Sequence, residues 1–182
     1  MGKSSSSNNS SNNFLRLSGR EKKIALVVLA FVLAGAWIPA RIIVSTSPSL
    51  NHRIFFKVPV VKEKIKRGDY LVFPMEKKYS RFLKKGIREN DRMIKRVGCE
   101  PGDILTRYPQ GFYCTTPDKT RIFLGMPLEK DSKGDKLPIF NVTGQIPPDN
   151  YFMVGDAARS FDSRYFGFVT AGDFITKAIP LW

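Results

Sequence analysis

One lysine lies within an otherwise apolar segment of the chain. Lys95 follows Met93 and Ile94 and comes two residues before Val97. Successive side chains of a β-strand point to opposite faces, so Met93, Lys95 and Val97 share one face of the predicted strand. Burial disfavours the charged form of a lysine and can bring its pKa from ~10.4 down to about 7–8, where it can act as a general base. The alternative is a surface lysine whose stem packs on apolar neighbours while its ammonium group stays in water.

A cluster of hydroxyl side chains could supply the nucleophile for such a base. The segment reads Ser45-Thr46-Ser47-Pro48-Ser49-Leu50. A serine hydroxyl becomes a nucleophile when a neighbouring base takes its proton. Both Ser49 and Ser45 are candidate nucleophiles, and a plain linker is the alternative for this segment.

A third segment, residues 155–167, concentrates charges of both signs. It contains Asp156, Arg159, Asp162 and Arg164. The segment can support a site, or it can be an exposed loop held by ion pairs, which contribute little to stability when solvated.

The composition excludes several kinds of site. The chain has two cysteines and one histidine, His52. Two cysteines cannot form a four-cysteine zinc site, and one histidine cannot form a multi-histidine metal centre. A serine–histidine mechanism would have to use His52 and would leave Lys95 unexplained. We therefore expect neither a metal nor a cofactor.

An uncharged apolar run, residues 24–40, precedes all three segments. As a helix these 17 residues extend about 26 Å, which reaches the lower limit for a bilayer span. Trp37 lies near the end of the run, where interfacial aromatic residues are favoured. A cleaved signal peptide is one alternative; a buried core helix is another, but the run lacks a polar face. We expect a transmembrane anchor.

The remaining chain divides at this anchor. Residues 1–23 are predicted to be a disordered, basic tail with five basic residues and one acidic residue, hence a charge of +4. Basic residues stay on the cytoplasmic side, so we expect an inner-membrane protein with residues 41–182 in the periplasm. Of the total charge of +14, +10 falls on residues 41–182, which suits an anionic lipid surface. No nucleic-acid-binding motif accompanies that charge, so no nucleic-acid partner is expected.

Short strands dominate the pattern after the anchor. Apolar or β-branched runs at 41–47, 54–61, 70–73, 93–97 and 151–154, with hairpins over 104–142, predict an all-β sandwich or folded barrel. Residues 76–90 carry Phe82, Leu83 and Ile87 at the spacing of one helical face.

The two cysteines, Cys99 and Cys114, flank a predicted hairpin around residues 108–111. Cysteines outside the cytoplasm often pair, and a cross-strand disulfide is geometrically reasonable here. Two buried free thiols are the alternative.

In this order, the segments resemble those of the type I signal peptidases, which are membrane-anchored serine/lysine endopeptidases. The resemblance covers residues 24–182 and includes GDYLVF, IKRVGCEPGD, PPDNYFMVGD and SFDSRYFGFV. The serine segment, continuing as SLNHRIF, looks closest to the conjugative-transfer (TraF-type) branch. The resemblance implies a mainly β, signal-peptidase-like catalytic domain with one N-terminal transmembrane helix.

The resemblance also implies roles for individual residues. Ser49 is the nucleophile and Lys95 is the general base. The family often has a hydroxyl two residues before the nucleophile, in the oxyanion hole; Ser47 meets this need for Ser49, whereas Ile43 cannot meet it for Ser45. Three further assignments are a lysine-orienting hydroxyl, a supporting carboxylate and a structural ion pair: Ser160, Asp156, and Asp162 with Arg164.

The substrates implied by the resemblance are exported preproteins with small residues before the scissile bond. The conjugative branch implies a pilin precursor, which is either hydrolysed or cyclised. The alternative function is a non-catalytic, membrane-anchored assembly protein of a conjugation or secretion apparatus that retains the peptidase fold.

Overall fold

A computed structural model describes residues 18–75 and 91–182 of the chain. The chain divides into two compact units, Met1–Ala40 and Arg41–Trp182. The helical face predicted within residues 76–90 lies outside the described residues.

The first unit contains one helix, α1 (Gly19–Ala40), in its described part. The helix begins with a capping box, in which the Ser18 amide donates to Glu21 Oε2 at 2.7 Å and the Glu21 amide donates to Ser18 Oγ at 3.4 Å. The helix therefore starts before the uncharged run at residue 24. By length and composition α1 is a candidate membrane span, although a signal sequence near the N-terminus has the same properties.

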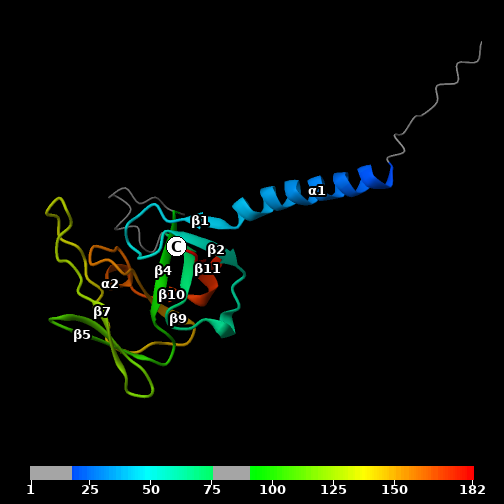
Figure 1. Cartoon of the computed structure of the whole chain (residues 1–182). Helices are drawn as coiled ribbons and strands as arrows, with labels where there is room; N and C mark the ends of the chain where they lie inside the picture. The colour runs from blue at the N-terminus through cyan, green and yellow to red at the C-terminus, as the bar shows by residue number, and fades with distance from the viewer. Residues whose placement is uncertain (1–17, 76–90) are drawn as a thin grey trace, which may run out of the picture. The chain divides into compact units, whose positions relative to one another are not determined.

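The second unit is built mainly of β-structure, as predicted from the sequence (Figure 1). Its larger sheet has the strand order β1-β2-β11-β3-β4-β9-β10, with antiparallel neighbours. The strands are β1 (Ile42–Val44), β2 (Ile54–Val58), β3 (Tyr70–Pro74), β4 (Arg92–Cys99), β9 (Asn150–Val154), β10 (Val169–Thr170) and β11 (Thr176–Pro180).

A second, antiparallel sheet has the order β7-β6-β5-β8. Its strands are β5 (Ile104–Tyr108), β6 (Gly111–Thr115), β7 (Arg121–Gly125) and β8 (Gly144–Gln145). The hairpins predicted over 104–142 thus end at Gly125. Between Gly125 and Gly144 only the isolated bridge between Lys130 and Lys136 is strand-like.

Two predicted strands are longer than the observed ones. β1 ends at Val44, where the chain enters the serine segment, and β2 ends at Val58, before Pro59. Proline has no amide hydrogen to donate to a sheet, which explains the early end of β2. The short helices are η1 (Lys62–Lys64), α2 (Ser163–Phe166) and η3 (Ala171–Asp173).

Strand β4 is buried on both faces. Val97 belongs to a core with Leu71 and Phe73, whereas Ile94 belongs to another core with Val72. The sequence alternation of β4 therefore separates two apolar environments, one on each side of the sheet. Lys95 lies on the Val97 side.

Cys99 and Cys114 form a disulfide, with their Cα atoms 5.7 Å apart. The predicted disulfide is confirmed, and its two cysteines flank the β5–β6 hairpin in the sequence, as expected; the bridge, however, does not link the two strands of that hairpin. Cys99 is the last residue of β4 in the larger sheet, and Cys114 lies on β6 of the smaller one. The turn at residues 101–102 carries the chain from one sheet to the other, so the disulfide joins the two sheets.

Removing this disulfide is expected to destabilise the second unit. The cysteines are 15 residues apart, and closing a loop of that length is worth about 3 kcal/mol in the chain-entropy model. We expect the double variant Cys99→Ala/Cys114→Ala to lose about that much free energy of unfolding, measured by urea titration of the full chain in detergent. An unchanged urea midpoint would contradict this expectation.

Candidate active site

Strand β4 lies between β3 and β9, and Lys95 comes just before the first residue of β4 that pairs with β9. Lys95 is paired with Leu71 of β3 on one side. On the other side, pairing with β9 begins only at Arg96, which faces Val154. Within the described ranges no strand pairs with β4 on that side before Arg96. The side chain is only 4% exposed, so burial and a free backbone edge coincide at this lysine.

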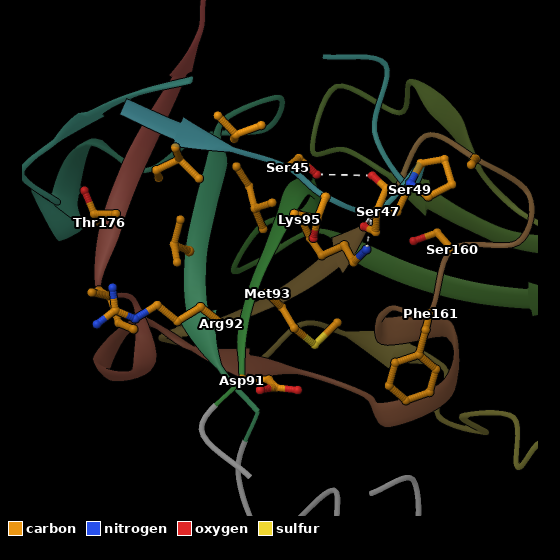
Figure 2. A pocket seen from close by; sticks show the side chains of 18 of the residues that line it. Ser45, Ser47, Ser49, Asp91, Arg92, Met93, Lys95, Ser160, Phe161 and Thr176 are labelled. Atoms are coloured by element: carbon orange, nitrogen blue, oxygen red, sulfur yellow. Dashed lines mark hydrogen bonds between the residues drawn. The ribbon is translucent and has the colours of Figure 1, made fainter. Parts of the chain in front are cut away.

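The serine segment lies next to the Lys95 side chain. Lys95 Nζ is 2.8 Å from Ser49 Oγ, and Ser47 Oγ is 2.9 Å from the same Ser49 oxygen. Ser45 Oγ donates to the backbone oxygen of Ser47 at 3.2 Å. Figure 2 shows the three serines and Lys95 gathered at one side of a pocket. Of the two candidate nucleophiles, Ser49 is the one bonded to the lysine.

Burial lowers the pKa of Lys95 from 10.5 to about 8. The loss of water around the ammonium group is the main cause, and the positive charge of Arg164 acts in the same direction. The charges of Asp162 and Asp156 act in the opposite direction. At pH 7 about one-tenth of a lysine with this pKa is neutral and able to accept a proton.

The backbone of Ser49 is anchored by the loop after β9. The Ser49 carbonyl accepts from the amides of Asp156 at 2.8 Å and Ala157 at 3.3 Å. The Asp156 carboxylate in turn accepts from the Asn51 amide at 3.1 Å and from Arg96 Nε at 2.8 Å. These bonds tie the serine segment to β4 through Asp156 and Arg96.

Ser160 also lines the pocket, and its hydroxyl points inward in Figure 2. Ser160 is 2% exposed, and its Oγ has no hydrogen-bond partner in the described part of the chain. The structure therefore brings this predicted lysine-orienting residue to the site without a bond to Lys95.

Gly155 has no room for a side chain, because the Ser49 backbone and the Ser160 side chain both pack against its Cα atom. A Cβ atom at this position would lie 2.7 Å from the Ser49 backbone oxygen and would overlap the Ser160 side chain. A contact this short between a carbon atom and a backbone atom is a steric clash, and the chain must move to relieve it. Any side chain here would displace the serine segment.

We expect Gly155→Ala to reduce kcat at least tenfold, because small displacements of reacting groups have large effects on rate. Gly172→Ala is the matched control, since a Cβ there meets only Thr170 Oγ1 at 3.9 Å. Rates of both variants on one peptide substrate test this. Equal rates for the two variants would show that the close packing at Gly155 does not position Ser49.

The predicted ion pair is formed and fully buried. Asp162 is 0% and Arg164 1% exposed, and their nearest charged atoms are 2.7 Å apart. Asp162 also accepts from the Gly155 amide at 2.8 Å. Arg164 donates to the backbone oxygens of Ser160 and Met126 at 3.3 and 3.1 Å. The pair thus fixes the loop that carries Ser160.

A cleft of about 860 Å³ runs past these groups. Three residues of its lining, Ile43, Val72 and Ile94, belong to one apolar cluster. Met93 and Phe161, which also line it, pack against another cluster, and Ser160 precedes Phe161. The arrangement can hold an extended peptide whose carbonyl carbon faces Ser49.

Five of the predicted site residues line this cleft: Ser45, Ser47, Ser49, Lys95 and Ser160. Asp156, Asp162 and Arg164 lie behind its wall and bond to the segments that carry those residues. Sequence reasoning missed two contributors, Arg96 and Gly155. Arg96 follows the key lysine directly, but its partner Asp156 is 60 residues away in the chain. His52 packs edge-on against Phe55 and Tyr70, with ring centroids 6.3 and 5.9 Å away.

One group of possible metal ligands occurs in the described residues, formed by Cys99, Asp103 and Cys114. The two sulfur atoms are bonded to each other. Asp103 is already paired with Arg67 at 2.5 Å and accepts from the Glu100 amide at 2.9 Å. The two sulfur atoms and the Asp103 carboxylate are therefore already engaged, and these three residues do not fit a metal centre while the disulfide is intact.

Comparison with known proteins gives a family for the chain. Residues 20–182 match the model of a family described as signal peptidase, peptidase S26. Among solved structures, a signal peptidase I from Enterococcus faecalis V583 matches with 23% sequence identity and a TM-score of 0.38. That match covers 65% of this chain and 97% of the other.

Proposed function

The chain belongs to the signal peptidase family, peptidase S26, and on this basis we propose that it is a serine endopeptidase in which Ser49 is the nucleophile and Lys95 the general base. The observation that carries the proposal is the 2.8 Å contact between Lys95 Nζ and Ser49 Oγ in a buried environment. Membership of the family implies leader-peptide cleavage from preproteins.

The first half of the reaction is acylation. Neutral Lys95 takes the proton of the Ser49 hydroxyl while Ser49 Oγ attacks the substrate carbonyl carbon. The Ser47 hydroxyl and the Ser49 amide donate hydrogen bonds to the oxyanion that forms. The protonated lysine then gives its proton to the leaving amine, and an ester to Ser49 remains.

The second half releases the acyl group. Lys95, neutral again after protonating the leaving amine, takes a proton from a water molecule, which attacks the ester carbonyl. Ser49 leaves with a proton returned by the lysine. In the conjugative branch, an amine of the same peptide replaces water and the product is a cyclic pilin; we propose a pilin precursor as the substrate.

We also propose where each part of the chain lies relative to the membrane. Residues 1–23 form a cytoplasmic tail, residues 24–40 the membrane anchor, and residues 41–182 the periplasmic peptidase domain of an inner-membrane protein. The uncharged apolar run 24–40 and the basic residues that precede it in the chain support this orientation. A reporter fused to either end, tested for activity on each side of the membrane, measures the orientation directly.

Loss of the Ser47 hydroxyl is expected to reduce the rate of acylation. Ser47→Ala removes one of two proposed oxyanion donors, which typically reduces kcat by about 10²–10³-fold. KM for the same peptide should change little, because the oxyanion exists only after attack. Steady-state kinetics separate these constants, and a change confined to KM would argue against an oxyanion role.

The proposed function is tested by co-expressing the full chain with candidate pilin and secretory precursors and following processing by mass spectrometry. Wild type, Ser49→Ala, Ser45→Ala and Lys95→Ala are compared. We expect Ser49→Ala and Lys95→Ala to stop cleavage and Ser45→Ala to retain it. A product about 18 Da lighter than the linear peptide, the mass of the water that ring closure leaves out, would identify cyclisation.

Two other outcomes of this experiment would contradict the proposed function or its nucleophile. If only Ser45→Ala stops processing, the nucleophile is Ser45. If wild type and all three variants process nothing, the chain is a non-catalytic assembly protein that retains the peptidase fold.

A further inference from the structure

The cleft continues beyond the dyad, on the side of β4 opposite Ile94. Met93 and Lys95 share that face of the strand, and both line the cleft. Phe161 contributes to the same wall from the loop after β9. In Figure 2 the Met93 side chain points to the side of the pocket on which Phe161 lies. Both side chains pack against the same apolar cluster, and the cleft beside them is also lined by Asp91, Arg92 and Arg159.

Phe161 is held firmly in this position. Its ring stacks on Tyr165 with centroids 5.7 Å apart and an interplanar angle of 17°, and it lies 5.4 Å from the ring of Phe166. Its chain neighbours Ser160 and Asp162 are buried, and Arg164 bonds to both of them. A partly exposed phenylalanine between two buried, clamped residues presents a fixed surface to the cleft.

The proton transfer from Lys95 to the leaving amine indicates which part of a substrate lies against Met93 and Phe161. The lysine that accepts the serine proton must deliver it to the leaving amine, so the leaving segment lies beside Lys95 Nζ. An extended peptide directs successive side chains to opposite sides. If the residue before the scissile bond packs on the Ile43, Val72 and Ile94 wall, the next residue is directed toward Met93 and Phe161.

We propose that Met93 and Phe161 form the subsite for the first residue after the scissile bond, and that this subsite selects an apolar side chain. The inference rests on the proposed function, because it assumes cleavage through Ser49. It adds a second element of substrate choice to the small residue expected before the bond. A carboxylate placed there would lose water without gaining a partner from either side chain.

The test uses the full chain in detergent and a set of peptides that differ only in the residue after the scissile bond. That residue is leucine, alanine, aspartate or lysine. We expect wild type to cleave the leucine peptide at least tenfold faster, by kcat/KM, than the aspartate peptide. Phe161→Ala and Met93→Ala should each reduce this preference at least threefold.

A charge swap separates recognition from a purely structural role. Phe161→Lys should raise cleavage of the aspartate peptide relative to the lysine peptide, which a loosened loop alone would not do. Phe123→Ala is the control, since Phe123 is an exposed aromatic residue on β7 of the other sheet and does not line the cleft. Its preference should match that of wild type.

The outcomes distinguish the two proposals. If cleavage depends on Ser49 but wild type, Phe161→Ala and Phe161→Lys all show the same preference among the peptides, the proposed subsite is wrong. The proposed function is not affected by that result. Peptides that remain intact with both wild type and Ser49→Ala overturn the proposed function, and the subsite with it.

Discussion

Replacing Lys95 with methionine is expected to lower kcat/KM on a leader peptide by about 10³-fold, because the variant keeps the length of the side chain and loses the proposed base. The methionine is also suited to the apolar neighbours of β4, so the folded structure should persist. Lys133→Met, which changes an exposed lysine, is the control and should retain wild-type activity. A Lys95→Met enzyme within tenfold of wild type would mean that another group accepts the serine proton.

The same lysine sets the pH dependence of wild type. Only the neutral form accepts a proton, and its pKa is lowered to about 8 by burial. The neutral fraction increases as pH rises, so kcat/KM should increase with pH and level off above about 8. A profile of kcat/KM from pH 5.5 to 9.5 tests this, and a plateau already reached at pH 6 would contradict a lysine base.

Replacing Arg164 with methionine is expected to cost about 3–5 kcal/mol of the free energy of unfolding, because it leaves the Asp162 carboxylate buried without its partner. The variant also removes donors to the Ser160 and Met126 backbone oxygens. Activity should therefore be lost together with stability. Urea unfolding of the full chain in detergent gives the energy.

A second ion pair provides the comparison for Arg164. Lys177 contacts Asp69 at 2.7 Å, but the lysine side chain is 28% exposed. Because water still reaches the lysine of this partly buried pair, Lys177→Met should lower the free energy of unfolding clearly less than Arg164→Met does. Equal losses for Arg164→Met and Lys177→Met would show that burial of the Asp162–Arg164 pair does not set its importance.

Local sequence patterns were sufficient for the features that depend on neighbouring residues. Alternation along β4 predicted a lysine on an apolar face, and Lys95 is 4% exposed. The frequency of short strands predicted a mainly β domain, and the observed unit has two antiparallel sheets. Each of these predictions uses only the alternation of apolar and polar residues within a short segment.

Contacts between distant segments could not be predicted in the same way. The placement of the disulfide depends on a turn that moves the chain from one sheet to the other after Cys99. The bond between Arg96 and Asp156 joins residues 60 positions apart. The helix α1 begins at a Ser18–Glu21 capping box, which lies outside the apolar run from which the anchor was predicted.

The most direct test of the proposed mechanism is to find the atom that carries the acyl group. Wild type is mixed with a slowly turned-over leader peptide, quenched in acid within milliseconds to seconds, digested, and mapped by fragmentation mass spectrometry. We expect the acyl part of the peptide to be attached to Ser49, and Lys95→Met to yield no acyl-enzyme on this time scale. An acyl group on Ser45, or peptide cleavage by an enzyme whose serines never carry one, would contradict the proposed mechanism.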